Sequence, residues 1–203
     1  TDIAVNAGAQ TLDDTYIVFD IETTGFSSIR DRIIEIGAVK VVNGRIVDRF
    51  STFVNPQRPI PFEITNLSSI TDEMVMDSPA IDVILPQFLE FIGDGVLVAH
   101  NAGFDVGFIE QNCRNLGLND HFVYLDTVAL ARVLLPTLSK YKLNVVAKAL
   151  NISLENHHRA VDDAGATAEI FVKFVEMLKK DNITTLKEVN HFGDRNVNAI
   201  RKM

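Results

Sequence analysis

The chain has 203 residues, 47% of them hydrophobic and 23% charged, which suits one globular domain with a single sizeable core. Its formal net charge of -8 argues against a protein that holds nucleic acid through its overall field, although it allows metal-assisted chemistry on phosphates. The single cysteine, Cys113, rules out an internal disulfide, and no apolar run approaches the roughly 18 residues of a membrane span, so we expect a cytoplasmic protein without a membrane partner.

Strands dominate the first part of the chain. The stretches TYIVFD and IIEIGAVKVVNGRIVDRFSTFV predict three strands, and Asn43-Gly44 predicts a hairpin turn between the last two. After a proline-rich connection, a helical pattern covers about residues 79–92, and Pro86 either kinks this helix or begins it anew. The sheet should therefore begin as an antiparallel one.

Strands and helices alternate in the rest of the chain. GVLVAH predicts a short buried strand before a helix at about residues 103–116, and FVYLDTVALARVLL repeats this order. Further helices are predicted at about residues 143–150 and 162–180. The order of elements predicts an α/β fold, in which a mixed five-stranded sheet, with three antiparallel strands first, is flanked by helices.

The patterned part of the sequence lies between two weakly patterned ends. We expect an N-terminal flanking segment at residues 1–15, the main domain at residues 16–180, and a C-terminal helical or linker segment at residues 181–203. The polar ends, and a start without methionine, favour a domain cut from a longer polypeptide.

Two carboxylates stand at the end of the first buried strand, in YIVFDIETTGF. Side chains two residues apart on a strand point to the same face, so Asp20 and Glu22 should converge. At about 5 Å and an effective dielectric near 20, such a pair repels by roughly 3 kcal/mol. Either a cation lies between them, or both residues follow the strand and cap the turn at residues 23–25.

Two further acidic positions follow. In LVAHNAGFD, Asp105 falls in the first turn of a helix after a buried strand, the usual place for a functional group in open α/β sheets, although stabilisation of the helix dipole would also explain it. In HHRAVDDAGATAEIF, Asp162 and Asp163 open another helix, and one of them could be a simple cap. Oxygen ligands without a thiolate cluster suit Mg²⁺ or Mn²⁺ rather than zinc.

Three segments together resemble a known enzyme family. F-D-I-E-T-T-G, H-N-A-x-F-D and H-R-A-V-D-D-A are similar, in this order, to the three motifs of the DEDDh (DnaQ-like) 3'-5' exonucleases, which have an RNase H-like fold. The resemblance runs from about residue 16 to residue 178. Within the family, LSSITDEMV and LDTVALARVLLP resemble the proofreading exonuclease domain embedded in PolC-type bacterial DNA polymerase III, except that many relatives have glycine where this chain has Ser69.

The resemblance implies a site for two divalent metal ions, Mg²⁺ or Mn²⁺. Asp20 would bridge the two ions. Glu22 and Asp163 would complete the first metal site, and Asp105 would serve the second. These four carboxylates would also be the catalytic acidic set.

The resemblance also implies a general base, His158, which lies five residues before Asp163. An unperturbed histidine has a pKa near 6.5 and can accept a proton at neutral pH. His157 and Asp162 have the same spacing, so the register is a choice, and the D-D-A context favours His158 with Asp163.

Contacts with the substrate are implied in the same way. Backbone groups of the turn after the first strand would hold the terminal nucleotide, and aromatic and polar side chains would surround it. Core packing of Phe26 and Phe104, and a hydrogen-bonded strand-end role for His100, are equally simple alternatives. The implied contact residues are Thr23, Thr24, Gly25, Phe26, His100, Asn101 and Phe104.

The function implied by the resemblance is hydrolysis of terminal phosphodiesters of DNA in the 3'-5' direction, with release of nucleoside 5'-monophosphates, as the proofreading activity of a replicative polymerase. Its partners would be a single-stranded or frayed 3' end, the rest of the polymerase chain and the replisome. Two alternatives stay open: a free-standing or helicase-linked nuclease acting on RNA or short oligonucleotides, and an inactive nucleic-acid-binding module. The complete acidic set together with His158 argues against the inactive module.

Overall fold

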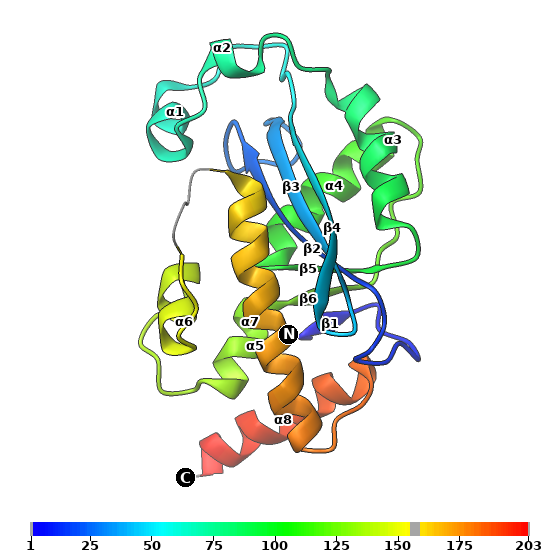
Figure 1. The fold of residues 1–203 in the computed structure, drawn as a ribbon, viewed down its shortest axis with the longest axis vertical. Helices are drawn as coiled ribbons and strands as arrows, with labels where there is room; N and C mark the ends of the chain where they lie inside the picture. The colour runs from blue at the N-terminus through cyan, green and yellow to red at the C-terminus, as the bar shows by residue number, and fades with distance from the viewer. Residues whose placement is uncertain (1, 155–158, 203) are drawn as a thin grey trace.

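The computed structural model describes residues 2–154 and 159–202, and of residues 195–202 it describes the course of the backbone. Within these ranges, six strands form one sheet in the order β1-β6-β5-β2-β3-β4. Helices cover both faces of this sheet (Figure 1). The strands are β1 (Ala4–Val5), β2 (Tyr16–Thr23), β3 (Ile33–Val42), β4 (Arg45–Phe53), β5 (Val96–Ala99) and β6 (Tyr124–Asp126).

The sheet is mixed, as the order of elements predicts. Strands β2, β3 and β4 are antiparallel, whereas β5 runs parallel to β2 and β6 runs parallel to β5. The predicted hairpin is confirmed, because Val42 pairs with Arg45 and both turn residues, Asn43 and Gly44, have positive φ. The sixth strand, β1, is an addition to the predicted five. It pairs with β6 and is only two residues long, which is too short for an alternating pattern to predict a strand.

The helices differ from the predicted set at one place. Two short helices, α1 and α2, occupy the stretch after the proline-rich connection and lie beyond one end of the sheet (Figure 1). Helix α3 runs unbroken through Pro86, whose side chain is exposed, so the helix does not begin anew there. The helices are α1 (Phe62–Ser68), α2 (Asp72–Val75), α3 (Ile81–Ile92), α4 (Ala102–Asn115), α5 (Thr127–Leu134), α6 (Leu143–Ala149), α7 (Ala160–Lys180) and α8 (Leu186–Lys202).

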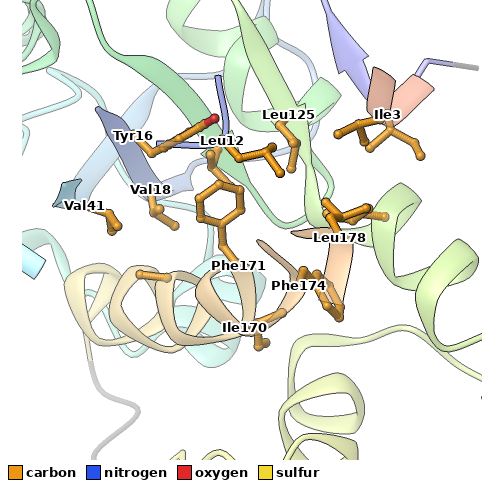
Figure 2. Close-up of a cluster of buried hydrophobic side chains, with 14 of the residues drawn as sticks. Ile3, Leu12, Tyr16, Val18, Val41, Leu125, Ile170, Phe171, Phe174 and Leu178 are labelled. Atoms are coloured by element: carbon orange, nitrogen blue, oxygen red, sulfur yellow. The ribbon is translucent and has the colours of Figure 1, made fainter. Parts of the chain in front are cut away.

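The long helix α7 packs on one face of the sheet and buries the larger core. Tyr16 and Val18 of β2 point to this face, and the rings of Tyr16 and Phe171 lie 4.6 Å apart between centroids (Figure 2). Leu178 packs in the same cluster. Because side chains alternate along a strand, Asp20 and Glu22 project toward the same face as Tyr16, beside the start of α7.

The opposite face is covered by α3 and α4. Ile17 and Phe19, which alternate with the residues of the first face, pack there with Phe88 and Cys113. The thiol of Cys113 is fully buried in this cluster. A strand covered on both faces explains why β2 has no alternating polar pattern before Asp20.

The N-terminal segment packs against the start of α8. Ile3 and Leu12 lie in the same core cluster as Leu186 and Val189, and the side-chain amide of Asn190 bonds the backbone of Ala4. The division of the chain at residues 15 and 180 stays a prediction. Among the described residues, no helix has the length and apolar character needed to cross a membrane.

Ser69 ends helix α1 in the left-handed conformation, with φ 64° and ψ 11°. Its backbone N–H donates to the carbonyl of Thr65 over 2.8 Å, which closes the last turn. Left-handed backbone is the conformation in which glycine is most easily accommodated, so a glycine would suit this turn as well as the serine does.

Candidate active site

Three of the predicted carboxylates come together at the end of β2. Asp20, Glu22 and Asp163 each offer an oxygen, and these three oxygens all lie within 4.8 Å of one another. The first two side chains belong to β2, and Asp163 belongs to the first turn of α7. This spacing suits shared ligation of a hard divalent cation, because each carboxylate can turn one oxygen toward a common point.

Asp105 lies beside this cluster and is buried in the first turn of α4. Its Oδ2 accepts a hydrogen bond of 3.3 Å from the backbone N–H of Ile21, the residue between Asp20 and Glu22. The bond ties the start of α4 to the end of β2. Asp105 is therefore adjacent to the three clustered carboxylates without belonging to their group.

The carboxylates share a strongly unfavourable electrostatic environment. Burial raises the pKa of Asp20 well above its ordinary value, and the charges of Asp105, Glu22 and Asp163 raise it further. Burial, followed by the charges of Glu35 and Asp163, raises the pKa of Glu22 to about 7. A bound divalent cation would reverse this cost, since it stabilises the ionised forms.

A fifth acidic residue, Glu35, supports the cluster and was not singled out from the sequence. It lies on β3 directly opposite Glu22 and is 1% exposed. Its Oε2 accepts from Arg159 Nε at 2.7 Å, and its Oε1 accepts from the backbone N–H of Ala160 at 3.0 Å. A charged residue in the middle of the apolar run IIEIGAV was the available signal.

These contacts fix the beginning of α7. Arg159 precedes the helix, and its guanidinium lies 4.0 Å above the ring of Phe53. At Gly37 of β3 the helix approaches so closely that a Cβ would lie 2.0 Å from the backbone nitrogen of Val161. The glycine and the carboxylate of Glu35 together hold the first turn of α7 against the sheet, which places Asp163 beside Asp20.

The start of α4 is held in a similar way. Asp126 Oδ1 accepts from the backbone N–H groups of Asn101, Ala102 and Val128 at 2.9 to 3.2 Å. Asn101 has φ 71°, the left-handed conformation that turns the chain from β5 into α4. Asp126 thus has a structural role at the starts of α4 and α5.

Both ring nitrogens of His100 are engaged inside the protein. Nδ1 lies 2.8 Å from the hydroxyl of Thr127, and Nε2 lies 2.6 Å from the carbonyl oxygen of Tyr141. A carbonyl only accepts, so Nε2 carries the proton. Burial lowers the pKa of His100, and the bond to Tyr141 partly opposes this. The hydrogen-bonded strand-end role therefore matches these contacts.

The turn after β2 is rigidly built. Thr23 Oγ1 donates to the carbonyl of Gly25 at 2.6 Å, and Thr24 exchanges hydrogen bonds with the backbone of Arg32. The carboxylate of Asp31 fills the space beside Gly25, where a Cβ would lie 2.5 Å from Oδ2. Backbone groups at residues 23–25 are therefore presented in a fixed arrangement next to Glu22.

Phe26 is 82% exposed, which excludes its interpretation as a core residue. Its ring meets that of Phe104 edge to face at 6.4 Å between centroids, and Phe104 in turn packs 5.1 Å from Phe108. Phe104 is partly buried against the core of the α4 face. The two rings form an aromatic surface on which the ring of Phe26 is exposed. In sequence, Phe26 lies four residues after Glu22, and Phe104 directly precedes Asp105.

His157 and the predicted base His158 lie outside the described residues. The structure therefore leaves the choice between the two histidine registers as a prediction.

The family comparison agrees with this arrangement of acidic residues. The family model for exonucleases matches residues 17–171. The chain belongs to this exonuclease family. The match contains all of β2 except its first residue, and also the starts of α4 and α7, so it includes the four metal-site carboxylates. The DnaQ-like assignment made from the three motifs is confirmed.

Curated relatives of this exonuclease chain are named "DNA polymerase III PolC-type". The protein of Clostridium perfringens is 58% identical over 192 residues, and that of Caldanaerobacter subterraneus is 50% identical over 188 residues. In both cases the alignment covers 93% of this chain and 13% of the relative. The exonuclease chain therefore spans about one eighth of the length of these relatives.

Solved structures agree on the fold. A structure described as "Exonuclease X in complex with 5' overhanging duplex DNA" has a TM-score of 0.68 and 28% identity, with 88% of this chain and 99% of the other covered. The nuclease domain of 3'hExo, described as a DEDDh family member bound to rAMP, has a TM-score of 0.71 and 18% identity, with 83% and 95% covered. The predicted RNase H-like fold is confirmed.

Proposed function

We propose that this exonuclease hydrolyses the terminal phosphodiester of a DNA strand in the 3'-5' direction, as the proofreading activity of a replicative DNA polymerase. The observation that carries the proposal is the meeting of Asp20, Glu22 and Asp163 within 4.8 Å at the junction of β2 and α7. The relatives named as PolC-type polymerases support the polymerase context. The products would be nucleoside 5'-monophosphates.

The acidic residues would hold two divalent metal ions, Mg²⁺ or Mn²⁺. Asp20 would be shared between the two ions, Glu22 and Asp163 would complete one site, and Asp105 would serve the other. When bound, such ions activate the attacking water and neutralise charge on the phosphate and the leaving 3' oxygen. The raised pKa values of Asp20, Glu22 and Asp105 support a cation there, since a crowded set of buried carboxylates needs positive charge to ionise fully.

The chain's own residues would position the reacting groups. His158 would accept the proton of the attacking water, with His157 and Asp162 as the alternative register. Glu35 and Arg159 would hold the start of α7, so that Asp163 stays aligned with Asp20. In this proposal His158 transfers the proton, and the ion pair of Glu35 and Arg159 keeps Asp163 aligned with Asp20.

The terminal nucleotide would lie on the turn after β2. Backbone groups of Thr23, Thr24 and Gly25 would bind its sugar and phosphate, and its base would stack on the exposed ring of Phe26 beside Phe104. Stacking tolerates any base, as proofreading requires. Asn101 and His100 would contribute by shaping the wall at the start of α4, where they are held by Asp126 and Tyr141.

The polymerase context explains why a chain of net charge -8 would act on DNA. Its long-range attraction for a polyanion is small, so it needs a partner that delivers the 3' end at high local concentration. The remainder of the polymerase chain and the replisome would be that partner, in the cytoplasm. Its substrate would be a single-stranded or frayed 3' end.

The test uses end-labelled strands. The 203-residue chain is incubated with matched DNA and RNA oligonucleotides and Mg²⁺ or Mn²⁺, and the products are resolved over time. We expect stepwise shortening from the 3' end of DNA, loss of activity in Asp163→Ala, and a much larger rate loss in His158→Ala than in His157→Ala. A faster reaction on RNA would favour an RNA-trimming nuclease, and binding without hydrolysis would favour an inactive module.

A further inference from the structure

A polar hollow of about 300 Å³ lies outside the acidic cluster. It is bounded by the far side of the turn after β2, the segment after β4, the start of α3 and the end of α4. None of the four metal-site carboxylates lines it, and neither does Phe26 or Phe104. Its polar lining includes Arg30, Arg32, Arg58, Gln57, Asn112 and Asn115.

Three arginines give this hollow a positive character in a protein whose net charge is -8. Arg32 Nη1 donates to the carbonyl of Pro56 at 2.7 Å, and Arg58 Nη1 donates to the carbonyl of Arg30 at 2.9 Å. Among the side chains that the structure describes, at residues 2–154 and 159–194, none of the three makes an ion pair with a carboxylate. The carbonyls hold two guanidinium groups in place without neutralising them.

One carboxylate, that of Asp31, also lines the hollow, but it is occupied by the turn itself. Its Oδ2 accepts from the backbone N–H of Ser27 at 2.9 Å, and its Oδ1 accepts from the hydroxyl of Thr24 at 3.2 Å. Three fixed or exposed guanidinium groups against one engaged carboxylate leave a net positive site. Arginine offers five N–H donors in a planar fork that matches the geometry of both carboxylate and phosphate groups.

The hollow lies close to the acidic cluster but on the other side of the turn. Arg32 is bonded through its backbone to Thr24, which is two residues beyond Glu22. On α4, Asn112 of the hollow is seven residues after Asp105, which corresponds to a rise of about 10 Å. A 3' end that stops at the acidic cluster would therefore stop short of the arginines.

We infer that this hollow binds the phosphate backbone of the complementary strand, where that strand runs past the 3' end being hydrolysed. The inference rests on the proposed function, since it takes the terminal nucleotide to lie on the acidic side of the turn. A template strand continues beyond the primer end and carries a phosphate at each nucleotide, so with the primer end on the acidic side its phosphates would pass the far side of the turn. The arginines then recognise a 5' overhang by charge and without reading its sequence.

The test is a binding measurement without divalent ions, so that no hydrolysis takes place. Fluorescence anisotropy gives the Kd of the 203-residue chain for a primer annealed to a template with a 5' overhang, and for the primer strand alone. The variant is Arg30→Ala with Arg58→Ala. The control is Arg45→Ala with Lys148→Ala, which removes the same charge from exposed positions outside the hollow.

We expect the hollow variant to bind the overhang duplex about 10-fold more weakly than the control variant does. The slope of its log affinity against log salt concentration should also be smaller in magnitude by about 1 to 2. For the primer strand alone, the two variants should show the same small increase in Kd. Equal losses on both ligands would assign the arginines to the hydrolysed strand and overturn the inference, and so would equal Kd values for the two variants on the duplex. Hydrolysis is measured separately with Mn²⁺. A chain that fails to hydrolyse DNA, yet shows the overhang-specific loss, would refute the proposed function and support the phosphate site.

Discussion

Arg159 donates its Nε proton to Glu35 Oε2 over 2.7 Å, and this bond joins the residue before α7 to the strand beside Glu22. The carboxylate of Glu35 is buried, whereas 40% of the Arg159 side chain is exposed. The second oxygen of Glu35 accepts a hydrogen bond from the N–H of Ala160. This N–H is one of the donors at the start of a helix that have no acceptor within the helix itself. One buried side chain therefore anchors both the helix and its preceding residue.

We predict that Glu35→Ala costs about 2 to 4 kcal/mol of unfolding free energy, because it leaves the Ala160 N–H and the guanidinium without their acceptor. It should also raise the Mn²⁺ concentration needed for half-maximal hydrolysis, since Asp163 loses its alignment. Thermal unfolding and a metal titration of the rate measure the two effects. Glu35→Gln retains an acceptor for Ala160 and should recover most of the metal response. An unchanged metal titration in Glu35→Ala would reduce the ion pair to a purely structural role.

The metal-free protein should become more stable when one clustered carboxylate is made neutral. The pKa of Asp20 is raised above its unfolded value, so ionising it in the folded state opposes folding increasingly as pH rises above about 4. We predict that Asp20→Asn raises the unfolding free energy by about 1 to 3 kcal/mol at pH 8 and by less at pH 5, while it abolishes hydrolysis. Denaturant unfolding in a chelator at both pH values measures this, with the exposed Asp94→Asn as control. Destabilisation of the Asp20→Asn chain at pH 8 would contradict the repulsion argument.

Most of the fold and of the acidic cluster could be predicted from local sequence patterns. The features that could not be predicted depend on long-range contacts. The β2 run, the Asn43-Gly44 turn and the acidic helix starts are all readable within a few residues. Strand β1 is defined only by its pairing with β6, and the partner of Glu35 lies 124 residues away, so neither has a local signature. Phe26 shows the same limit, since an apolar residue in sequence is as compatible with a core as with an exposed stacking ring.

His100 should contribute stability at neutral pH that disappears in acid. Its pKa is lowered by burial, so the folded state binds the proton less readily than the unfolded chain. The contribution is present above the unfolded pKa of about 6.5 and is lost as pH falls toward the folded value, by up to about 1.4 kcal/mol per pH unit. We predict that unfolding free energies from pH 8 to pH 5 show this fall in the unmodified chain relative to His100→Gln. Parallel curves for the two proteins would mean that the pKa of His100 is the same in the folded and unfolded states.

The left-handed conformation of Ser69 predicts a stabilising substitution. A side chain at φ 64° costs backbone energy that glycine avoids, and the exposed serine side chain has little packing to lose. We expect Ser69→Gly to raise the unfolding free energy by about 0.5 to 1 kcal/mol. Asn66→Gly, at an exposed position within α1, should lower it by a similar amount, because glycine is unfavourable in a helix interior. Thermal unfolding of the two variants decides the point, and the opposite ranking would remove the conformational explanation.

The exposed ring of Phe26 should act on substrate binding and leave the fold intact. With 82% of the residue exposed, its truncation removes little buried area, but it removes the free face on which the terminal base would stack. We predict that Phe26→Ala raises KM about 5-fold to 150-fold, corresponding to roughly 1 to 3 kcal/mol, with little change in kcat or melting temperature. Phe104→Ala should raise KM as well, but it should also lower the melting temperature, because Phe104 packs on Phe108. Phe62→Ala on α1, where the ring is 74% exposed, tests whether any exposed phenylalanine has this effect. A KM for Phe26→Ala no higher than that for Phe62→Ala would show that the ring is not part of the nucleotide site, and the turn at residues 23–25 would then have to bind the terminal nucleotide through its backbone alone.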